Sequence, residues 1–339
     1  MESPRITQRD VALRAGVSQA TVSTWLSGNA DTVAPETAER IRCAIAELGY
    51  RPNRFARALR TQRSMVAACV VPDLLNPFYP ALLVAAQQVM EKSDYELVAV
   101  NTGGRPEAEA AVIEGAANGR YDGILGVFFT RRVADFAAMI SAGVSLVRIE
   151  AHAKRGGELA VDDIFVDNAE AARQVTRHLL DLGHRRIAMI AGEGGPQSMR
   201  LDGYVAALRE VGLKPELHTD PSFSDHGGEA ATRRMLEQGP PPTAIVAAND
   251  LMAIGAMRAL TATGLAVGRD VSVIGFDDIM PASLVSPRLT TVALNQDRMG
   301  RRAAELLLDR MQGRFSGGGR AFEMPFDIVI RESVAPPGG

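Results

Sequence analysis

Most of the chain alternates between short apolar runs and longer segments in which apolar residues recur every three or four positions. The runs predict buried parallel strands, and the periodic segments predict amphipathic helices that cover a sheet. Strands are expected at 65–71, 96–100, 123–129, 145–149, 186–191, 243–247 and 271–276. Helices are expected at 80–92, 107–119, 169–182, 200–211 and 251–263. This alternation predicts an α/β fold with parallel sheets covered on both faces.

An irregular, glycine-containing stretch at 151–163 interrupts the alternation and predicts a crossing between two lobes. A late strand at 290–294, a helix at 296–312 and a final strand at 322–330 would return the chain to the first lobe and back again. The first lobe is therefore assigned to about 63–162 and 294–320, and the second to about 163–293 and 321–332. Repeated crossings of this kind predict a clamp that bends at a hinge.

The first 50 residues have a different pattern, in which capping residues punctuate short helical segments. Thr7 and Asp10 form a capping pattern, and Gly16 suits the left-handed turn that ends a helix. Ser18 is a good cap for the next helix, and Pro35 opens a third. The spacing predicts an all-α helix-turn-helix headpiece at 1–50, which would present its second helix to the major groove of DNA.

The distribution of charge supports this interpretation of the headpiece. Residues 1–63 contain ten arginines, no lysine and six acidic residues, a net charge of +4, whereas the whole chain carries −3. The remainder must then carry about −7. A basic headpiece on an acidic body confines phosphate attraction to one end of the chain. The alternative, an ordinary three-helix cap on a larger domain, is less favoured by this asymmetry.

Composition and motifs argue against several other classes of protein. The sequence starts Met-Glu-Ser-Pro-Arg, with no apolar signal segment, and no apolar run is long enough for a membrane helix, so we expect a cytoplasmic protein. Cys43 and Cys69 have neither metal-site nor redox spacing. No catalytic motif is found, and we expect neither an enzyme nor a cofactor or metal.

Polar and aromatic residues follow several of the expected strands. In parallel sheets, ligands bind beyond the carboxyl ends of the strands. The residues at these positions include Phe78, Tyr79, Arg200, Asn249 and Asp277, and Phe223 is a further aromatic candidate. Arginine and carboxylate together can hold a small polyhydroxylated or carboxylated ligand, and the aromatic rings supply apolar faces. Each residue also has a local alternative: Asp277 could cap a turn, Arg200 could form a structural ion pair, and Phe78 could belong to the core.

Several motifs together resemble the LacI/GalR family of bacterial transcriptional regulators. They are Asp10-Val11-Ala12-x-x-Ala15-Gly16-Val17-Ser18-x-x-Thr21-Val22-Ser23, Gly49-Tyr50-x-Pro52-Asn53, Pro72-Asp73-x-x-Asn76-Pro77-Phe78, Val166-Asp167-Asn168, Leu182-Gly183-His184-Arg185-Arg186-Ile187 and Ile274-Gly275-Phe276-Asp277. The resemblance implies a homodimer that binds a near-palindromic double-stranded operator. It also implies a hinge at 51–62 and an effector-binding body at 63–339, similar to periplasmic sugar-binding proteins.

The same resemblance assigns roles to individual residues. It implies that Gln19, Ala20 and Thr24 read bases, and that Leu59 wedges into the minor groove. It implies phosphate contacts for Ser18, Thr21, Ser23 and Asn53. The effector-contacting positions that it implies are Phe78, Tyr79, Arg200, Phe223, Asn249 and Asp277.

Two departures from the family pattern bear on specificity. Thr24 stands where relatives often have arginine or histidine, so a direct base contact there would be short or mediated by water. Apart from Ser198, the loop 194–199 lacks the purine-contacting residues of the purine-repressor branch. This absence favours a sugar or sugar acid as the effector. We therefore expect an effector-controlled repressor, with a solute-binding protein and a sugar-modifying enzyme as the alternatives.

The tail at 332–339 lacks leucine heptads, which favours a dimer over a tetramer.

Overall fold

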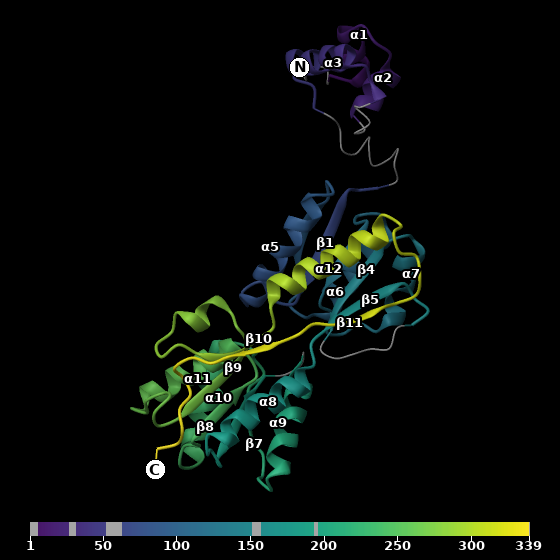
Figure 1. Cartoon of the computed structure of the whole chain (residues 1–339). Coiled ribbons are helices and arrows are strands. Elements are labelled where there is room, and N and C mark those ends of the chain that lie inside the picture. The colour runs from purple at the N-terminus through teal and green to yellow at the C-terminus, as the bar shows by residue number, and fades with distance from the viewer. Residues whose placement is uncertain (1–5, 27–31, 52–62, 151–156, 193–195, 339) are drawn as a thin grey trace. The chain divides into compact units, whose positions relative to one another are not determined.

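The structure, a computed structural model, describes residues 6–26, 32–51, 63–150, 157–192 and 196–338. The chain divides into two units, Met1–Ser64 and Met65–Gly339. The larger unit carries two sheets, and we call the parts built on them the first and second lobes. Figure 1 shows the course of the chain.

The small unit contains helices α1 (Gln8–Ala15), α2 (Gln19–Leu26) and α3 (Pro35–Leu48). The capping box that the sequence predicts is present, because the backbone N–H of Asp10 donates to Thr7 Oγ1 and that of Thr7 donates to Asp10 Oδ2. Gly16 ends α1 at φ +64°, a backbone conformation that favours glycine. These contacts fix the short turn into α2.

An apolar core holds the three helices of the small unit together. Val11, Val22 and Ile41 are fully buried, one from each helix, and Ala12 and Ala15 fill the space between them. The outer residues of α2 remain at the surface. The helical pattern of the first 50 residues is therefore confirmed as a packed three-helix unit.

The first lobe is built on a six-stranded parallel sheet with the order β11-β5-β4-β3-β1-β2. Its strands are β1 (Val66–Val71), β2 (Glu96–Asn101), β3 (Gly123–Gly126), β4 (Ser145–Glu150), β5 (Val161–Phe165) and β11 (Ala321–Glu323). The apolar run of β1 alternates between the two faces. Cys69 and Val71 belong to the cluster on one face, and Ala68 and Val70 to the cluster on the other. Burial on both faces explains why the run reads as continuously apolar.

The second lobe repeats this plan with the order β12-β10-β9-β8-β6-β7. Its strands are β6 (Ile187–Ala191), β7 (Glu216–Thr219), β8 (Ala244–Ala247), β9 (Ser272–Asp277), β10 (Thr290–Ala293) and β12 (Asp327–Val329). All pairs are parallel except β12, which runs antiparallel to β10. The predicted α/β fold with parallel sheets is confirmed.

Helices cover both sheets and pack in pairs. The first lobe contains α5 (Phe78–Glu91), α6 (Pro106–Ala117), η2 (Val133–Phe136), α7 (Ala137–Ser141) and α12 (Gln296–Met311). The second lobe contains α8 (Asn168–Asp181), α9 (Gln197–Glu210), α10 (Asp225–Gln238), α11 (Asp250–Ala262) and η3 (Met280–Ser283). Helices α8 and α9 approach so closely that a Cβ on Gly203 would lie 1.9 Å from the carbonyl oxygen of Ala169. A glycine is therefore required at this crossing.

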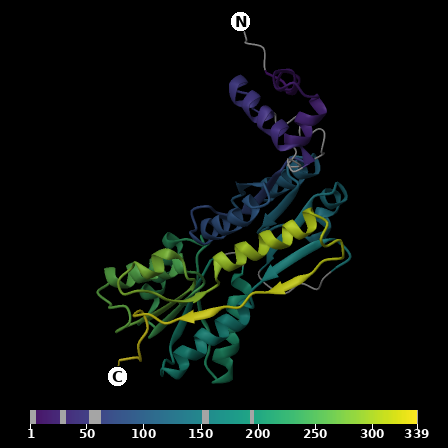
Figure 2. The ribbon, with the colours of Figure 1, turned by 45° about the horizontal axis from the view of Figure 1, so that its top comes forward.

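The structure corrects the predicted course of the chain at three places. β5 lies in the first sheet and β11 pairs with it, so the first lobe extends beyond the predicted limits of 162 and 320. The expected final strand at 322–330 is two strands, β11 in the first lobe and β12 in the second. β7 was not predicted at all. The C-terminal segment, yellow in Figures 1 and 2, runs from α12 along the first lobe and returns to the second.

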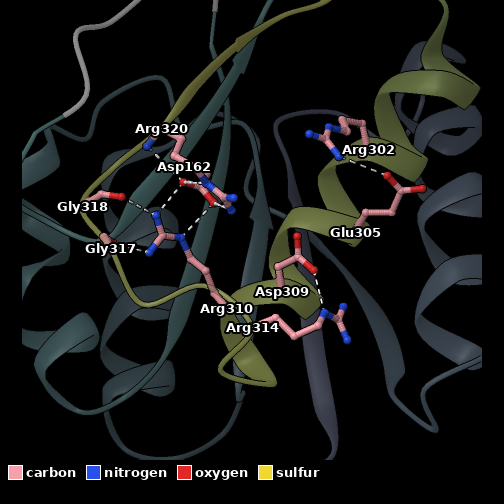
Figure 3. Close-up of polar contacts among 9 residues, drawn as sticks. All are labelled: Asp162, Arg302, Glu305, Asp309, Arg310, Arg314, Gly317, Gly318 and Arg320. Atoms are coloured by element: carbon pink, nitrogen blue, oxygen red, sulfur yellow. Dashed lines mark hydrogen bonds and ion pairs between the residues drawn. The ribbon is translucent and has the colours of Figure 1, made fainter.

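A buried carboxylate explains why the predicted boundaries fell short. Asp162 on β5 is fully buried and accepts hydrogen bonds from Arg310 Nε at 2.8 Å and Arg320 Nη2 at 2.7 Å. Figure 3 shows both guanidinium groups directed at this carboxylate. Arg310 lies in α12 and Arg320 precedes β11, so the contact joins β5 to two segments that come much later in the chain.

None of the helices in the described ranges has an apolar stretch long enough to cross a membrane.

Candidate functional site

The exposed start of α2 is the first candidate site. Ser18, Gln19 and Ala20 are all exposed there. The backbone N–H of Thr21 donates to Ser18 Oγ at 3.0 Å, and the two hydroxyl oxygens of Ser18 and Thr21 lie 2.8 Å apart. Ser18 therefore caps the helix, as the sequence predicts. Gln19 lies in the first turn of α2, the part of a recognition helix that contacts base edges.

The other positions on α2 with predicted DNA contacts, Thr21, Ser23 and Thr24, are less exposed. Ser23 and Thr24 are half-buried, and the Thr24 hydroxyl donates to the carbonyl oxygen of Ala20 at 3.0 Å. This contact holds the hydroxyl close to its own helix, which fits the short reach expected at position 24. The predicted DNA contacts Asn53 and Leu59 lie outside the described residues.

The second candidate site is a cavity of about 800 Å³ in the larger unit. It is lined by both lobes, with Phe78 and Tyr79 from the first and Arg200, Phe223 and Asp277 from the second. Phe78 and Tyr79 follow β1, Arg200 and Phe223 follow β6 and β7, and Asp277 ends β9, so the structure brings together residues from the carboxyl ends of parallel strands. The volume is in the range of small-molecule sites in proteins.

Arg200 is the most constrained side chain of the cavity. It is only 2 % exposed, and its guanidinium group lies over the ring of Phe276, 4.5 Å from the centroid. Nε donates to Asn168 Oδ1 at 2.9 Å, and Nη1 donates to the carbonyl oxygen of Ala248. Nη2 lies 3.4 Å from Asp277 Oδ1. The guanidinium plane is therefore fixed before any ligand arrives.

Asp277 is held in an unusual backbone conformation at the end of β9. Its φ of +113° is rare for any residue other than glycine, and its carbonyl oxygen accepts a hydrogen bond from Gln296 at the start of α12. Burial raises the pKa of the carboxyl group to about 6, although the neighbouring Arg200 lowers it in part. The structure thus keeps a poorly solvated carboxylate beside a fixed guanidinium group, and both residues line the cavity.

Aromatic rings form the apolar part of the cavity. Phe78 and Tyr79 pack edge to face, with centroids 5.1 Å apart and planes at 87°. Burial raises the pKa of Tyr79, so its phenol remains a neutral donor or acceptor. Phe223 packs on Gly192, where a Cβ would lie 2.2 Å from the ring. Rings beside an arginine and a carboxylate suit a ligand with both apolar faces and hydroxyl groups.

Asn249 is placed differently from the prediction, because it does not line the cavity. It caps α11, accepting the N–H of Met252 at 2.8 Å, and its Nδ2 donates to the carbonyl oxygen of Phe223 at 3.3 Å. It therefore positions the Phe223 loop from behind. Asn168, which sequence reasoning did not select, lines the cavity and orients Arg200, and its place in the motif Val166-Asp167-Asn168 was the available signal.

Sequence reasoning also missed the loop that follows β3. Phe129, Thr130 and Arg131 line the cavity, but the expected strand at 123–129 extended too far to mark them as loop residues. The strand ends at Gly126, where φ is +153° and a Cβ would lie 2.1 Å from the carbonyl oxygen of Val70. The apolar run Val127-Phe128-Phe129 concealed this end.

A capped helix-turn-helix and a two-lobed ligand cavity on one chain define a ligand-responsive DNA-binding regulator. Residues 7–53 match the family model described as bacterial regulatory proteins, lacI family, and residues 176–334 match that of a periplasmic binding protein-like domain. The chain belongs to the LacI family of bacterial regulatory proteins. It is a transcriptional regulator and not an enzyme.

Similar proteins support this assignment over nearly the whole chain. The transcriptional regulator CelR of Thermobifida fusca is 35 % identical, covering 97 % of this chain and 98 % of its own. The transcriptional repressor CytR of Escherichia coli K12 is 33 % identical, with coverage of 97 % and 96 %. Among solved structures, the lac repressor dimer bound to operator and the anti-inducer ONPF has a TM-score of 0.83 at 29 % identity, covering 98 % of this chain and 99 % of its own. The CelR–cellobiose complex has a TM-score of 0.70 at 32 % identity, with coverage of 97 % and 100 %.

Proposed function

We propose that this regulator is a cytoplasmic repressor that binds a near-palindromic operator as a homodimer and responds to a sugar or sugar acid. The similar lac repressor has been solved as a dimer on its operator, and the similar CelR with cellobiose. The basic balance of residues 1–63 supports attraction to phosphates at the headpiece. Effector binding in the body would then control when the headpiece binds DNA.

The headpiece residues divide into two roles in this proposal. Gln19 and Ala20 read base edges from the exposed first turn of α2, and Thr24 contributes a short or water-mediated contact. The residues assigned to phosphates are Ser18, Thr21, Ser23 and Asn53. Leu59 is the proposed minor-groove wedge. The exposure of Gln19 at the N-terminus of α2 supports its assignment most directly.

The pairing of Arg200 with Asp277 carries the effector part of the proposal. The two groups are buried, rigidly held and 3.4 Å apart, and both line the cavity. A sugar offers adjacent hydroxyl groups, one of which can accept from the guanidinium while its neighbour donates to the carboxylate. The surrounding rings of Phe78, Tyr79 and Phe223 would stack on the C–H faces of the sugar.

A ligand in this cavity can act as a switch because it contacts both lobes. Tyr79 belongs to the first lobe and Asp277 to the second, and three segments of chain connect the lobes. Contacts that form fully in only one arrangement of the lobes favour that arrangement, and only such differential binding changes affinity for DNA.

Calorimetry against a panel of neutral sugars and sugar acids tests the effector site. Asp277→Asn should weaken binding of the active ligand at least tenfold, because the amide cannot replace a charged acceptor. The matched control is Asp181→Asn, which changes an exposed carboxylate at the end of α8 and should leave affinity unchanged. Unaltered ligand affinity in Asp277→Asn would contradict the proposed site.

A further inference from the structure

The loop after β3 is anchored to the first lobe by one buried carboxylate. Glu109 on α6 is fully buried and accepts hydrogen bonds from the backbone N–H groups of Phe129 at 2.8 Å and Thr130 at 3.1 Å. The Thr130 hydroxyl donates to the same group at 2.5 Å. Three donors on one carboxylate fix the loop, which lines the cavity through Phe129, Thr130 and Arg131.

Arg131 places a positive charge at the cavity wall, and two of its guanidinium nitrogen atoms have no hydrogen-bond acceptor in the described structure. Its side chain is 21 % exposed, and its Nε lies 3.6 Å from Glu109 Oε2, an ion-pair distance without a hydrogen bond. Nε is buried and lacks a hydrogen-bond partner among the described residues. Nη2 donates to the carbonyl oxygen of Pro106, and nothing in the described part of the chain accepts from Nη1. Glu109 therefore pairs with Arg131 by charge, but no hydrogen bond joins the two side chains.

Arg200 differs from Arg131 in this respect. All three of its nitrogen atoms have hydrogen-bond acceptors, one of which is the carboxylate of Asp277. Asp73, the other carboxylate on the cavity wall, accepts the N–H of Leu75 and forms no ion pair with Arg131 in the described structure. An anionic group entering the cavity can therefore accept from Nη1 of Arg131, for which the described structure holds no acceptor.

We propose that Arg131 forms a subsite for an anionic group of the effector, a carboxylate or a phosphate, so that the effector is an acidic sugar. Arginine presents planar donors that match both groups, and the partly buried position strengthens the contact. This inference rests on the proposed effector function of the cavity and specifies the class of ligand. Arg200 and Asp277 bind hydroxyl groups, and Arg131 distinguishes acidic sugars from neutral ones.

Calorimetry with matched pairs of ligands tests the subsite. The pairs are glucuronate with glucose, galacturonate with galactose, and glucose 6-phosphate with glucose. At least one acidic ligand should bind about tenfold more tightly than its neutral partner, and Arg131→Gln should abolish that preference. The uronates and the phosphate ester distinguish the two kinds of anionic group. Arg132→Gln is the control, because it removes the same charge from an exposed neighbour that does not line the cavity.

The possible outcomes separate this inference from the proposed function. Neutral sugars that bind as tightly as their acidic partners would overturn the subsite and leave the effector cavity intact. A preference for acids that survives in Arg131→Gln would also overturn it. Arg200→Gln should weaken acidic and neutral ligands alike, and binding of both classes that is unaffected by this change would count against the cavity itself.

Discussion

At the scale of single residues, Asp277 combines a strained backbone with an unfavourable environment for charge. Its φ is +113°, its side chain is nearly fully buried, and the neighbouring carboxylate of Asp250 is fully buried as well. Such positions persist only where surrounding structure fixes them, and they concentrate at functional sites. In the unliganded protein the charge on Asp277 therefore costs stability, and a ligand that donates hydrogen bonds to it recovers part of that cost.

The raised pKa of Asp277 predicts a dependence of stability on pH. The folded value is about 6 against an ordinary value of 3.8, so the folded protein binds the proton more tightly. The stabilisation is complete below the ordinary value and is lost as the pH rises through about 6. Between pH 5 and pH 7.5 the unliganded protein should lose about 1 kcal/mol of unfolding free energy more than Asp277→Asn loses.

Urea unfolding at these two pH values measures the difference. Burial raises the pKa of Asp250 well above its ordinary value, and the charge of Asp277 raises it further, so the comparison reports on the two neighbouring carboxyl groups together. An identical loss of unfolding free energy in the two proteins would contradict the raised pKa of Asp277.

At the scale of elements, the cluster of Asp162, Arg310 and Arg320, called the Asp162 cluster, joins α12 and β11 to β5. Burial pushes the pKa of Asp162 up, but hydrogen bonds from Arg310 and Arg320 outweigh it and hold the pKa below its ordinary value. Arg310 also donates to the carbonyl oxygens of Gly317 and Gly318 (Figure 3), so the turn between α12 and β11 depends on the same contacts. This turn supports the last strand of the first sheet.

Replacing Asp162 by Asn should destabilise the protein by about 3 kcal/mol, because the buried guanidinium group of Arg310 and the half-buried one of Arg320 lose their counter-charge. Asp309→Asn is the matched control on the same turn, since its pair with Arg314 is largely exposed and should contribute less than about 1 kcal/mol. Urea unfolding measures both changes. Equal, small losses in the two variants would show that the cluster does not stabilise the first lobe.

The strands that sequence reasoning found and missed differ in where their stabilising contacts come from. The apolar run of β1 carries its own signal, because every residue from Ala67 to Val71 is buried. β5 contains Asp162 and Asp163, which are buried only because Arg310, Arg320 and Arg148 pair with them. A local pattern cannot contain partners from other parts of the chain.

The residues of the candidate site also differ in whether the sequence could predict them. Phe78, Tyr79, Arg200 and Asp277 were predicted because they lie at or after the ends of expected strands, and Asn249 was selected for the same reason although it faces the interior. Arg131 was missed because β3 ends earlier than its apolar sequence indicates. The contribution of Glu109 depends on α6 packing beside the loop after β3, which only the tertiary structure reveals.

At the scale of the whole molecule, the chain combines a basic DNA-binding unit with an acidic, two-lobed body. Within the larger unit the chain crosses between the lobes after β5, after β10 and after β11. Connections of this kind permit hinge bending while each sheet stays intact. Ligand binding and DNA binding are then linked, and each must alter the affinity for the other by the same factor.

The most direct test of the central claim is the affinity of the full-length protein for DNA with and without its effector, measured by fluorescence anisotropy. The probes are a duplex from the region upstream of its own gene and a scrambled duplex of the same composition. The account predicts tighter binding to the first duplex, weaker binding to both at higher salt, and a change of about 5- to 150-fold in operator affinity on adding effector. Equal affinity for the two duplexes, together with no response to a ligand that occupies the cavity, would contradict it.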